Sequence, residues 1–131
     1  LKSENHTSIR KLLSEVFSPV NIKLKNAIEN NLYNNLSIHE LAYLCHMSLS
    51  TFKRTFKKTF GDTPARYIKN RKLVAAERRI TTTKDSITDI AFSLGFEDLS
   101  TFSTVFQKKY GLSPSKYRLA QKHNLKTSFG K

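Results

Sequence analysis

The longest uninterrupted helical pattern in the chain covers residues 63–82. Thr63 and Pro64 are typical of a helix start, because Thr can cap free N–H groups and Pro has the φ angle of the first helical turn. The apolar positions that follow lie near the helical period and are Ala65, Ile68, Leu73, Ala76 and Ile80. Since no further Gly or Pro interrupts the segment, it predicts one continuous basic helix, roughly 28 Å long.

Two shorter helices are predicted ahead of this segment. Ser37 and Glu40 form a capping box, in which the Ser37 hydroxyl accepts a hydrogen bond from the Glu40 N–H. A turn at His46–Met47 follows, Ser48 can cap the second helix, and Gly61 can end it. The apolar sides of the two helices consist of Ile38, Leu41, Ala42 and Cys45 in the first, and of Leu49, Phe52, Phe56 and Phe60 in the second.

The same pattern returns after the long helix. Ser86 and Asp89 repeat the cap arrangement, Gly95–Phe96 repeats the turn, Asp98 caps the second helix and Gly111 ends it. The apolar sides are now Ile87, Ile90, Ala91 and Leu94, and then Phe102, Val105, Phe106 and Tyr110. Because caps, apolar positions and final glycines agree, and a Ser/Thr-Pro pair follows each time, residues 37–67 and 86–117 are interpreted as two copies of a helix-turn-helix unit.

The ends of the chain flank these repeats. Residues 19–32 predict a one-sided helix that starts at Ser18-Pro19. Residues 8–17 predict an amphipathic helix through Ile9, Leu12, Leu13, Val16 and Phe17. This helix could pack on the core, or it could connect to an absent domain or pair with a second copy. Residues 119–131 form a basic tail without a periodic face, and we expect it to fray.

The net charge of the chain indicates which class of partner it binds. The chain has 131 residues, the size of one compact domain or two very small ones, and a formal net charge of +13. Such an imbalance opposes compaction and is usually retained because the partner is a polyanion. Nucleic acid is the first candidate and an anionic membrane surface the second. With only four Gly and three Pro, an all-α fold is expected over turn-rich β structure.

Enzymatic and metal chemistry find little support. The histidines lie at His6, His39, His46 and His123, without the spacing of a zinc site, and glycines are too few for a phosphate-binding loop. Cys45 is the one candidate nucleophile, but its place on an apolar helix face favours packing. We expect no catalytic residue, metal or cofactor. The lone cysteine, and the lack of a signal peptide or a long apolar run, predict a cytoplasmic, nucleoid-associated protein that does not enter membranes.

The motifs of both repeats indicate a family. They are residues 38–42 (IHELA), 47–48 (MS), 52–58 (FKRTFKK), 61–64 (GDTP), 67–68 (YI), 87–91 (ITDIA), 95–96 (GF), 102–106 (FSTVF), 108–114 (KKYGLSP) and 117–118 (YR). Together they resemble the C-terminal DNA-binding domain of AraC/XylS-type bacterial transcription regulators, over roughly residues 20–118.

The resemblance implies an organisation for the chain. Two helix-turn-helix subdomains, at 19–62 and 86–118, are joined by a linker helix at 63–82, giving about seven helices within 19–118. Each subdomain is expected to insert its second helix into one of two adjacent major-groove segments of double-stranded DNA. A separate sensing or dimerising domain, usually N-terminal, is also implied, and residues 1–18 would connect to it. An activator role, contact with RNA polymerase, and a homodimer through that domain or the 8–17 helix are further implications.

Helix geometry predicts the DNA contacts of the first repeat. Ser50, Lys53, Arg54 and Lys57 lie about half a turn away from the apolar side of their helix. Arg can donate two hydrogen bonds to guanine, so Arg54 is the predicted main base reader, with Lys53 beside it. The family's base-contacting positions also fall at Ser50, Lys53 and Arg54. Lys57 and Lys58 are predicted phosphate contacts. The alternative is that these charges form only a solvated helix face.

The same construction in the second repeat predicts that Ser100, Ser103, Thr104 and Gln107 point outward. Many family members carry Arg at the position of Thr104, and Ser and Thr select bases less sharply, so this unit could contribute more anchoring or shape readout. Leu99 could touch a thymine methyl or only pack. Backbone contacts are predicted at Gln107, Lys108 and Lys109, and at the helix starts Ser37 and Ser86. A non-specific polyanion binder remains the alternative function.

Overall fold

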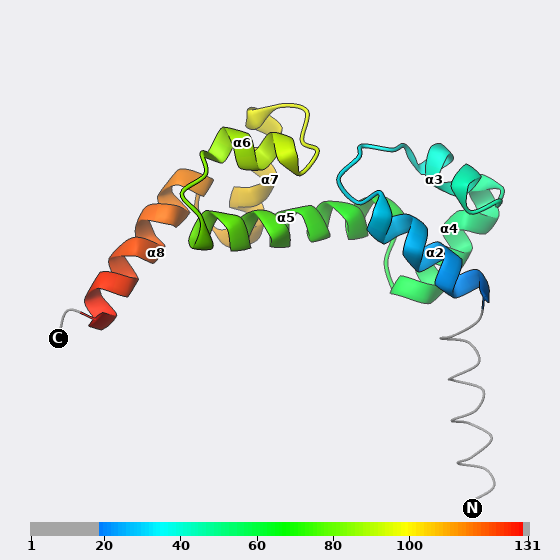
Figure 1. Ribbon diagram of the computed structural model, residues 1–131, viewed down its shortest axis with the longest axis horizontal. Helices are drawn as coiled ribbons and strands as arrows, with labels where there is room; N and C mark the ends of the chain where they lie inside the picture. Colours follow the sequence, from blue (N-terminus) through cyan, green and yellow to red (C-terminus); the bar gives the residue numbers. More distant parts are fainter. Residues whose placement is uncertain (1–18, 130–131) are drawn as a thin grey trace, which may run out of the picture. The chain divides into compact units, whose positions relative to one another are not determined.

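Seven helices make up the part of the chain that the structure describes, which is residues 19–129 of the computed structural model, with side chains described to His123. In chain order they are α2 (Pro19–Asn30), α3 (Ile38–Leu44), α4 (Leu49–Phe60), α5 (Pro64–Thr82), α6 (Ile87–Ser93), α7 (Leu99–Tyr110) and α8 (Pro114–Phe129) (Figure 1). The predicted all-α fold is confirmed over this range. The helix predicted at 8–17 lies outside the described residues.

The predicted helix caps are present. The first free N–H groups are satisfied by side chains in four helices: Glu40 N–H to Ser37 Oγ (3.1 Å), Thr51 N–H to Ser48 Oγ (3.3 Å), Asp89 N–H to Ser86 Oγ (3.0 Å) and Thr101 N–H to Asp98 Oδ1 (2.6 Å). Gly61 and Gly111 end α4 and α7 with φ angles of 77° and 85°. Local sequence therefore sets where these four helices begin and where two of them end.

Each helix-turn-helix turn requires one residue with a left-handed backbone. His46 has φ 56° and Gly95 has φ 91°, and these are the two positions predicted from the repeat. The turns are closed by equivalent backbone bonds, from the Met47 N–H to the Ala42 carbonyl (3.0 Å) and from the Phe96 N–H to the Ala91 carbonyl (3.1 Å). The two turns thus share one geometry although a histidine occupies one of them.

The chain divides into two compact units, and each unit has its own core. The first unit contains the described residues up to Leu32 together with Leu36–Ile68. Its core brings α2, α3 and α4 together through Leu24, Ile28, Leu32, Leu41, Ala42, Cys45, Phe52 and Phe56. Phe52 and Phe56 are fully buried, and Tyr67 meets Phe56 edge-on with ring centroids 5.4 Å apart. The predicted inner side of α4 is confirmed for Phe52, Phe56 and Phe60, whereas Leu49 is not among the residues of this core.

The second unit contains Tyr33–Asn35 and the chain from Lys69 onward. Its core is formed by Leu73, Ala76, Ile80, Ile90, Ala91, Leu94, Phe102 and Phe106. Tyr117 of α8 packs edge-on against Phe106, with centroids 5.5 Å apart, and its hydroxyl donates to the Glu77 carboxylate at 3.0 Å. The pairing of Phe106 with Tyr117 repeats the pairing of Phe56 with Tyr67.

Helix α5 is one continuous helix, as predicted, but its apolar stripe serves two cores. Ile68 packs on the first core, whereas Leu73, Ala76 and Ile80 are buried in the second. Ala65, which was predicted to belong to the stripe, is instead exposed. The reason is that the first turn of α5 belongs to the first unit and presents a different side to its core.

The repeat also extends further back than residue 37. At the same separation that relates α3 to α6, the α2 residues Asn21, Lys23, Leu24 and Ala27 match Asn70, Lys72, Leu73 and Ala76 of α5. Leu24 and Leu73 occupy the same place in their cores. Each repeat is therefore a three-helix unit.

The prediction of a fraying tail is wrong over residues 119–129, since α8 continues to Phe129. No Gly or Pro interrupts this stretch, so the helix that starts at Pro114 can extend without a regular apolar face.

Candidate nucleic-acid interface

Helix α4 carries an exposed basic side opposite its buried phenylalanines. Ser50, Lys53, Arg54, Lys57 and Lys58 are all exposed, as helix geometry predicted. Because Phe52 and Phe56 fix the helix on the core, these side chains have a rigid base. The structure thus places five of the six predicted contact residues of the first unit, all but Ser37, on the open face of one helix.

Four of these residues line a hollow together with residues that the sequence patterns did not identify. The hollow measures about 580 Å³ and is bordered by Ile38, Ser50, Lys53, Arg54, Lys57, Thr63, Pro64 and Ala65. Its residues come from the start of α3, the exposed side of α4 and the start of α5. Spacing within a single helix cannot reveal such a set, although Thr63-Pro64 marked one of its borders. The basic side chains of α4 therefore border a hollow to which α3, α4 and the start of α5 contribute.

The second unit presents a more polar and less basic face. Along α7, Leu99, Ser100, Thr104, Gln107 and Lys108 are exposed and Ser103 is half-buried. The Thr104 hydroxyl donates to the Ser100 backbone carbonyl at 2.9 Å, so its proton is already used within the helix. Leu99 is 38% exposed and is not among the residues of the second core.

Lysine 109 differs from its neighbour Lys108. Its ammonium group donates a hydrogen bond to the Asn70 side chain and lies 5.6 Å from the Tyr110 ring centroid. Both partners belong to the second unit, so this charge is held against the protein. Both lysines are exposed, so these contacts do not exclude Lys109 as a phosphate contact.

Ser37 and Ser86, the predicted backbone contacts at the helix starts, are exposed, but their side chains already accept hydrogen bonds within the protein. The Ser37 and Ser86 oxygens accept the capping bonds of α3 and α6. They lie at the surface, and Ser37 does not line the hollow beside α4.

Cys45 is buried in the first core, and burial raises the pKa of its thiol, with the positive charge of Lys23 opposing that shift. A raised pKa disfavours the reactive thiolate, so the packing role is supported. Among the described residues, no group of three or more His, Cys, Asp or Glu side chains could hold a metal ion. None of the described helices is both long and apolar enough to cross a membrane.

Comparison with known proteins decides the family. Residues 41–120 match the family described as "Helix-turn-helix domain", which is more than half of the chain. The fold matches the DNA-binding domain of AdpA, a global transcriptional factor crystallised with a target DNA, with a TM-score of 0.73 and 25% identity over 78% of this chain and 95% of that one. The chain belongs to the AraC/XylS family. It is thus a DNA-binding domain of the AraC/XylS type, a family of transcription regulators.

Relatives within the AraC/XylS family include named activators. The XylDLEGF operon transcriptional activator 1 of Pseudomonas putida is 36% identical over 88 residues, covering 63% of this chain and 27% of that protein. The transcriptional activator RhaS of Pectobacterium carotovorum is 37% identical over 71 residues, covering 54% and 25%. The C-terminal domain of the response regulator yesN from Fusobacterium nucleatum shares the fold with a TM-score of 0.67 and 29% identity, covering 72% and 93%. The chain therefore spans about a quarter of the length of these two activators.

Proposed function

We propose that this chain is the sequence-specific double-stranded DNA-binding part of a bacterial transcription activator. The observation that carries the proposal is the hollow beside α4, where Lys53, Arg54 and Lys57 converge on a rigid, concave surface of a domain of the AraC/XylS family. The net charge of +13 suits the polyanionic partner. The proposal includes no catalytic step, metal or cofactor.

In the first unit, the proposed base contacts are Ser50, Lys53 and Arg54. Arg54 is exposed on the open face of α4, where two parallel hydrogen bonds to guanine O6 and N7 are within the capacity of its guanidinium. Lys57 and Lys58 follow one turn later and neutralise phosphates. Ser37, at the start of α3, is a proposed backbone contact of the same unit.

In the second unit, the proposed base contacts are Leu99, Ser100, Ser103 and Thr104, and the proposed backbone contacts are Ser86, Gln107 and Lys108. The exposed Leu99 suits contact with a thymine methyl group. Because the Thr104 hydroxyl proton is directed to the Ser100 carbonyl, this side chain is left to act as an acceptor or through its methyl group. We therefore infer that the second unit selects bases less sharply than the first.

The organisation proposed for the chain is a first unit at 19–62, a linker helix at 63–82, a second unit at 86–118 and a basic tail at 119–131. Each unit inserts its second helix into one of two adjacent major-groove segments. In the whole protein, contact with RNA polymerase and pairing with a second copy, through a further domain or the 8–17 helix, would accompany activation. The activator names of the relatives support this role.

The alternative is a surface that binds any polyanion through charge alone. To separate the two, a preferred duplex is first selected from a random pool with the unmodified protein. Binding to that duplex is then measured against a large excess of random duplex, over a range of salt concentrations. Loss of all preference at every salt concentration would refute sequence-specific binding and favour the charge-only alternative.

Two substitutions on α4 then test the residue roles. Arg54→Ala should reduce the preference for the selected duplex over one with a mutated site by about 5- to 150-fold, the equivalent of roughly 1–3 kcal/mol. Lys57→Ala should weaken both duplexes by similar factors and lower the salt slope by about 1. Lys25→Ala, which removes an exposed charge from α2, is the matched control and should change neither ratio. Equal effects of Arg54→Ala on both duplexes would remove Arg54 from base reading.

A further inference from the structure

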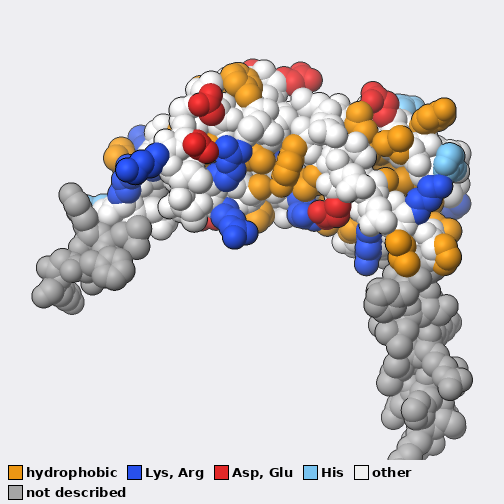
Figure 2. All heavy atoms as spheres, in the orientation of Figure 1, with side chains coloured by type: hydrophobic (Ala, Val, Ile, Leu, Met, Phe, Trp, Pro, Cys, Tyr) orange, Lys and Arg blue, Asp and Glu red, His pale blue; other side chains and the backbone are white. Residues whose placement is uncertain are grey.

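An apolar groove lies between α2 and α3 of the first unit. It consists of two hollows of about 600 and 340 Å³ that share Leu44. Around it, Ile22 is 45% exposed, Leu44 41% and Tyr43 80%. We call this surface the α2/α3 groove and define it by Pro19, Ile22, Ala27, Leu36, Tyr43 and Leu44. Apolar side chains gather over these two helices in Figure 2, and none of the six lines the hollow beside α4.

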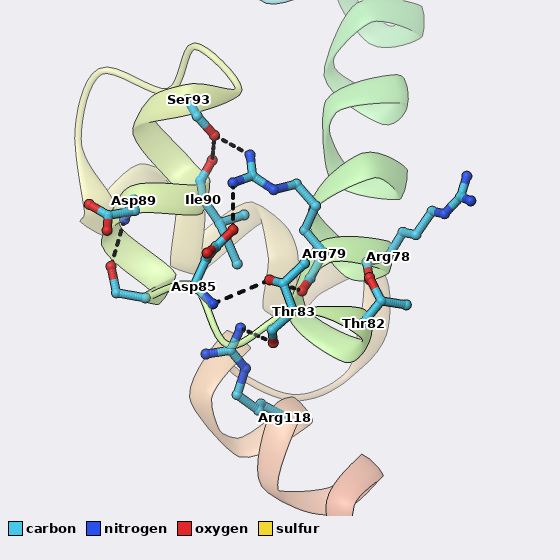
Figure 3. Close-up of polar contacts among 10 residues, drawn as sticks. Arg78, Arg79, Thr82, Thr83, Asp85, Asp89, Ile90, Ser93 and Arg118 are labelled. Atoms are coloured by element: carbon cyan, nitrogen blue, oxygen red, sulfur yellow. Dashed lines mark hydrogen bonds and ion pairs between the residues drawn. The ribbon is translucent and has the colours of Figure 1, made fainter.

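The second unit has a polar network at the equivalent positions (Figure 3). The Arg79 guanidinium of α5 pairs with the Asp85 carboxylate at 3.0 Å and also donates to the hydroxyl of Ser93, at the end of α6. The repeat matches these three residues to Asn30, Leu36 and Leu44 of the first unit. The first unit thus has two leucines in place of the partners of Arg79, and an asparagine in place of the arginine. It cannot form this network, and its groove stays open and apolar.

We propose that residues 8–17 of this chain fold as a helix against the α2/α3 groove. Pro19 lines the groove, so the polypeptide enters the described structure at the groove's own edge. The preceding residues carry an apolar stripe at helical spacing, formed by Ile9, Leu12, Leu13, Val16 and Phe17. A helix of about ten residues is marginal in water by itself, so it needs a surface on which to bury such a stripe. The groove offers that surface immediately next to it in the chain.

Charge supports the same occupant. Lys23 lines the groove at its α2 border. In a helix over 8–17, Glu15 borders one edge of the apolar stripe and Arg10 borders the other, so it is the Glu15 edge that suits the side of Lys23. The docked helix would hold the chain that precedes Pro19 against α3, the first helix of the helix-turn-helix unit. The connection into this unit would then be rigid and not flexible.

The test uses nuclear magnetic resonance on the full 131-residue chain. Nuclear Overhauser contacts are sought between the methyl groups of Leu44 or Ile22 and those of Leu12, Leu13 or Val16. A mixed sample of labelled and unlabelled chains separates contacts within one chain from contacts between copies. Hydrogen exchange of the 8–17 amides gives an independent readout, because a helix of this length is protected only when it is docked.

One substitution and a matched control complete the design. Leu44→Ser gives the groove the residue that the second unit has at this position, and Val74→Ser removes a similarly exposed apolar side chain, 46% exposed, from the second unit. We expect contacts within one chain and protection of about tenfold or more in the unmodified protein. Leu44→Ser should abolish both, and Val74→Ser should leave both unchanged.

Three results would overturn the proposal. The first is exchange of the 8–17 amides at the rates of an unstructured peptide in the unmodified protein. The second is methyl contacts seen only between labelled and unlabelled chains, which would make a second copy the occupant. The third is equal effects of the two serine substitutions. None of these results bears on DNA binding, so that part of the proposed function stands or falls separately.

Discussion

Gly95 is the position where a single methyl group should disturb the fold most clearly. Its φ of 91° is left-handed, and a Cβ atom added there would lie 2.7 Å from Asn35 Oδ1, 2.8 Å from the Tyr33 carbonyl oxygen and 3.2 Å from Lys72 Nζ. Gly111, in the same unit, has a similar φ of 85° and open space around its Cβ position. The pair therefore separates the cost of a left-handed backbone from the cost of a collision.

The expected loss of unfolding free energy follows from these two contributions. A left-handed backbone costs an L-residue roughly 1–2 kcal/mol, which applies to Gly95→Ala and Gly111→Ala alike. The collision at Gly95 adds about 1–3 kcal/mol, because one of the opposing atoms belongs to the backbone and cannot simply rotate away. Relieving it also disturbs the hydrogen bond from Lys72 to Asn35 (3.2 Å). We expect Gly95→Ala to destabilise the second unit by about 2–5 kcal/mol and Gly111→Ala by about 1–2 kcal/mol.

Native-state hydrogen exchange measures this difference within one unit. The slowest amides of α7 report the opening free energy of the second unit, and both substitutions are read on the same amides. The slowest amides of α4 belong to the first unit and should change little. If Gly95→Ala costs no more than Gly111→Ala, the close approach of residues 33–35 to the turn does not constrain this position, and the reasoning is refuted.

Two further predictions concern ionisable groups. Hydrogen bonds from the backbone N–H and the hydroxyl of Thr101 lower the pKa of Asp98. The ionised Asp98 cap therefore stabilises α7 fully at pH values above the unfolded-state pKa. This contribution is lost as the pH falls through the folded-state pKa. Asp98→Asn, which retains a capping oxygen, should flatten the acid limb of the second unit's stability in unfolding measured from about pH 6 down to about pH 2, and an unchanged acid limb would contradict this. Burial raises the pKa of the Cys45 thiol, so a thiol reagent should label it about tenfold or more slowly in the folded protein than in the urea-unfolded chain. Equal labelling rates would restore Cys45 as a candidate nucleophile.

Much of the fold was readable from the sequence because its signals are local. Ser37, Ser48, Ser86 and Asp98 cap the helices they were predicted to cap, since a capping side chain needs only an N–H group three residues away. The apolar period likewise predicted the buried sides of α4 and α7. The same period placed Arg54 on the exposed side of α4, and the repeated motifs indicated the family.

Other features depended on which core each residue joined, and periodicity does not record that. The stripe of α5 looked continuous, yet Ile68 packs in one core and Leu73 in the other. Residues 33–35 lie between two helices of the first unit but belong to the second. The hollow beside α4 gathers side chains from three helices, so no single spacing describes it.

By itself, then, the sequence determined the helices, their ends, their buried sides and the family, because each of these depends on residues a few positions apart or on a repeated motif. Only the tertiary structure decided how α5 is shared between two cores, which residues join Arg54 at the hollow, and that Arg79 meets Asp85 and Ser93 in the second unit. Those features arise where side chains distant in sequence meet, and their partners follow from packing in three dimensions.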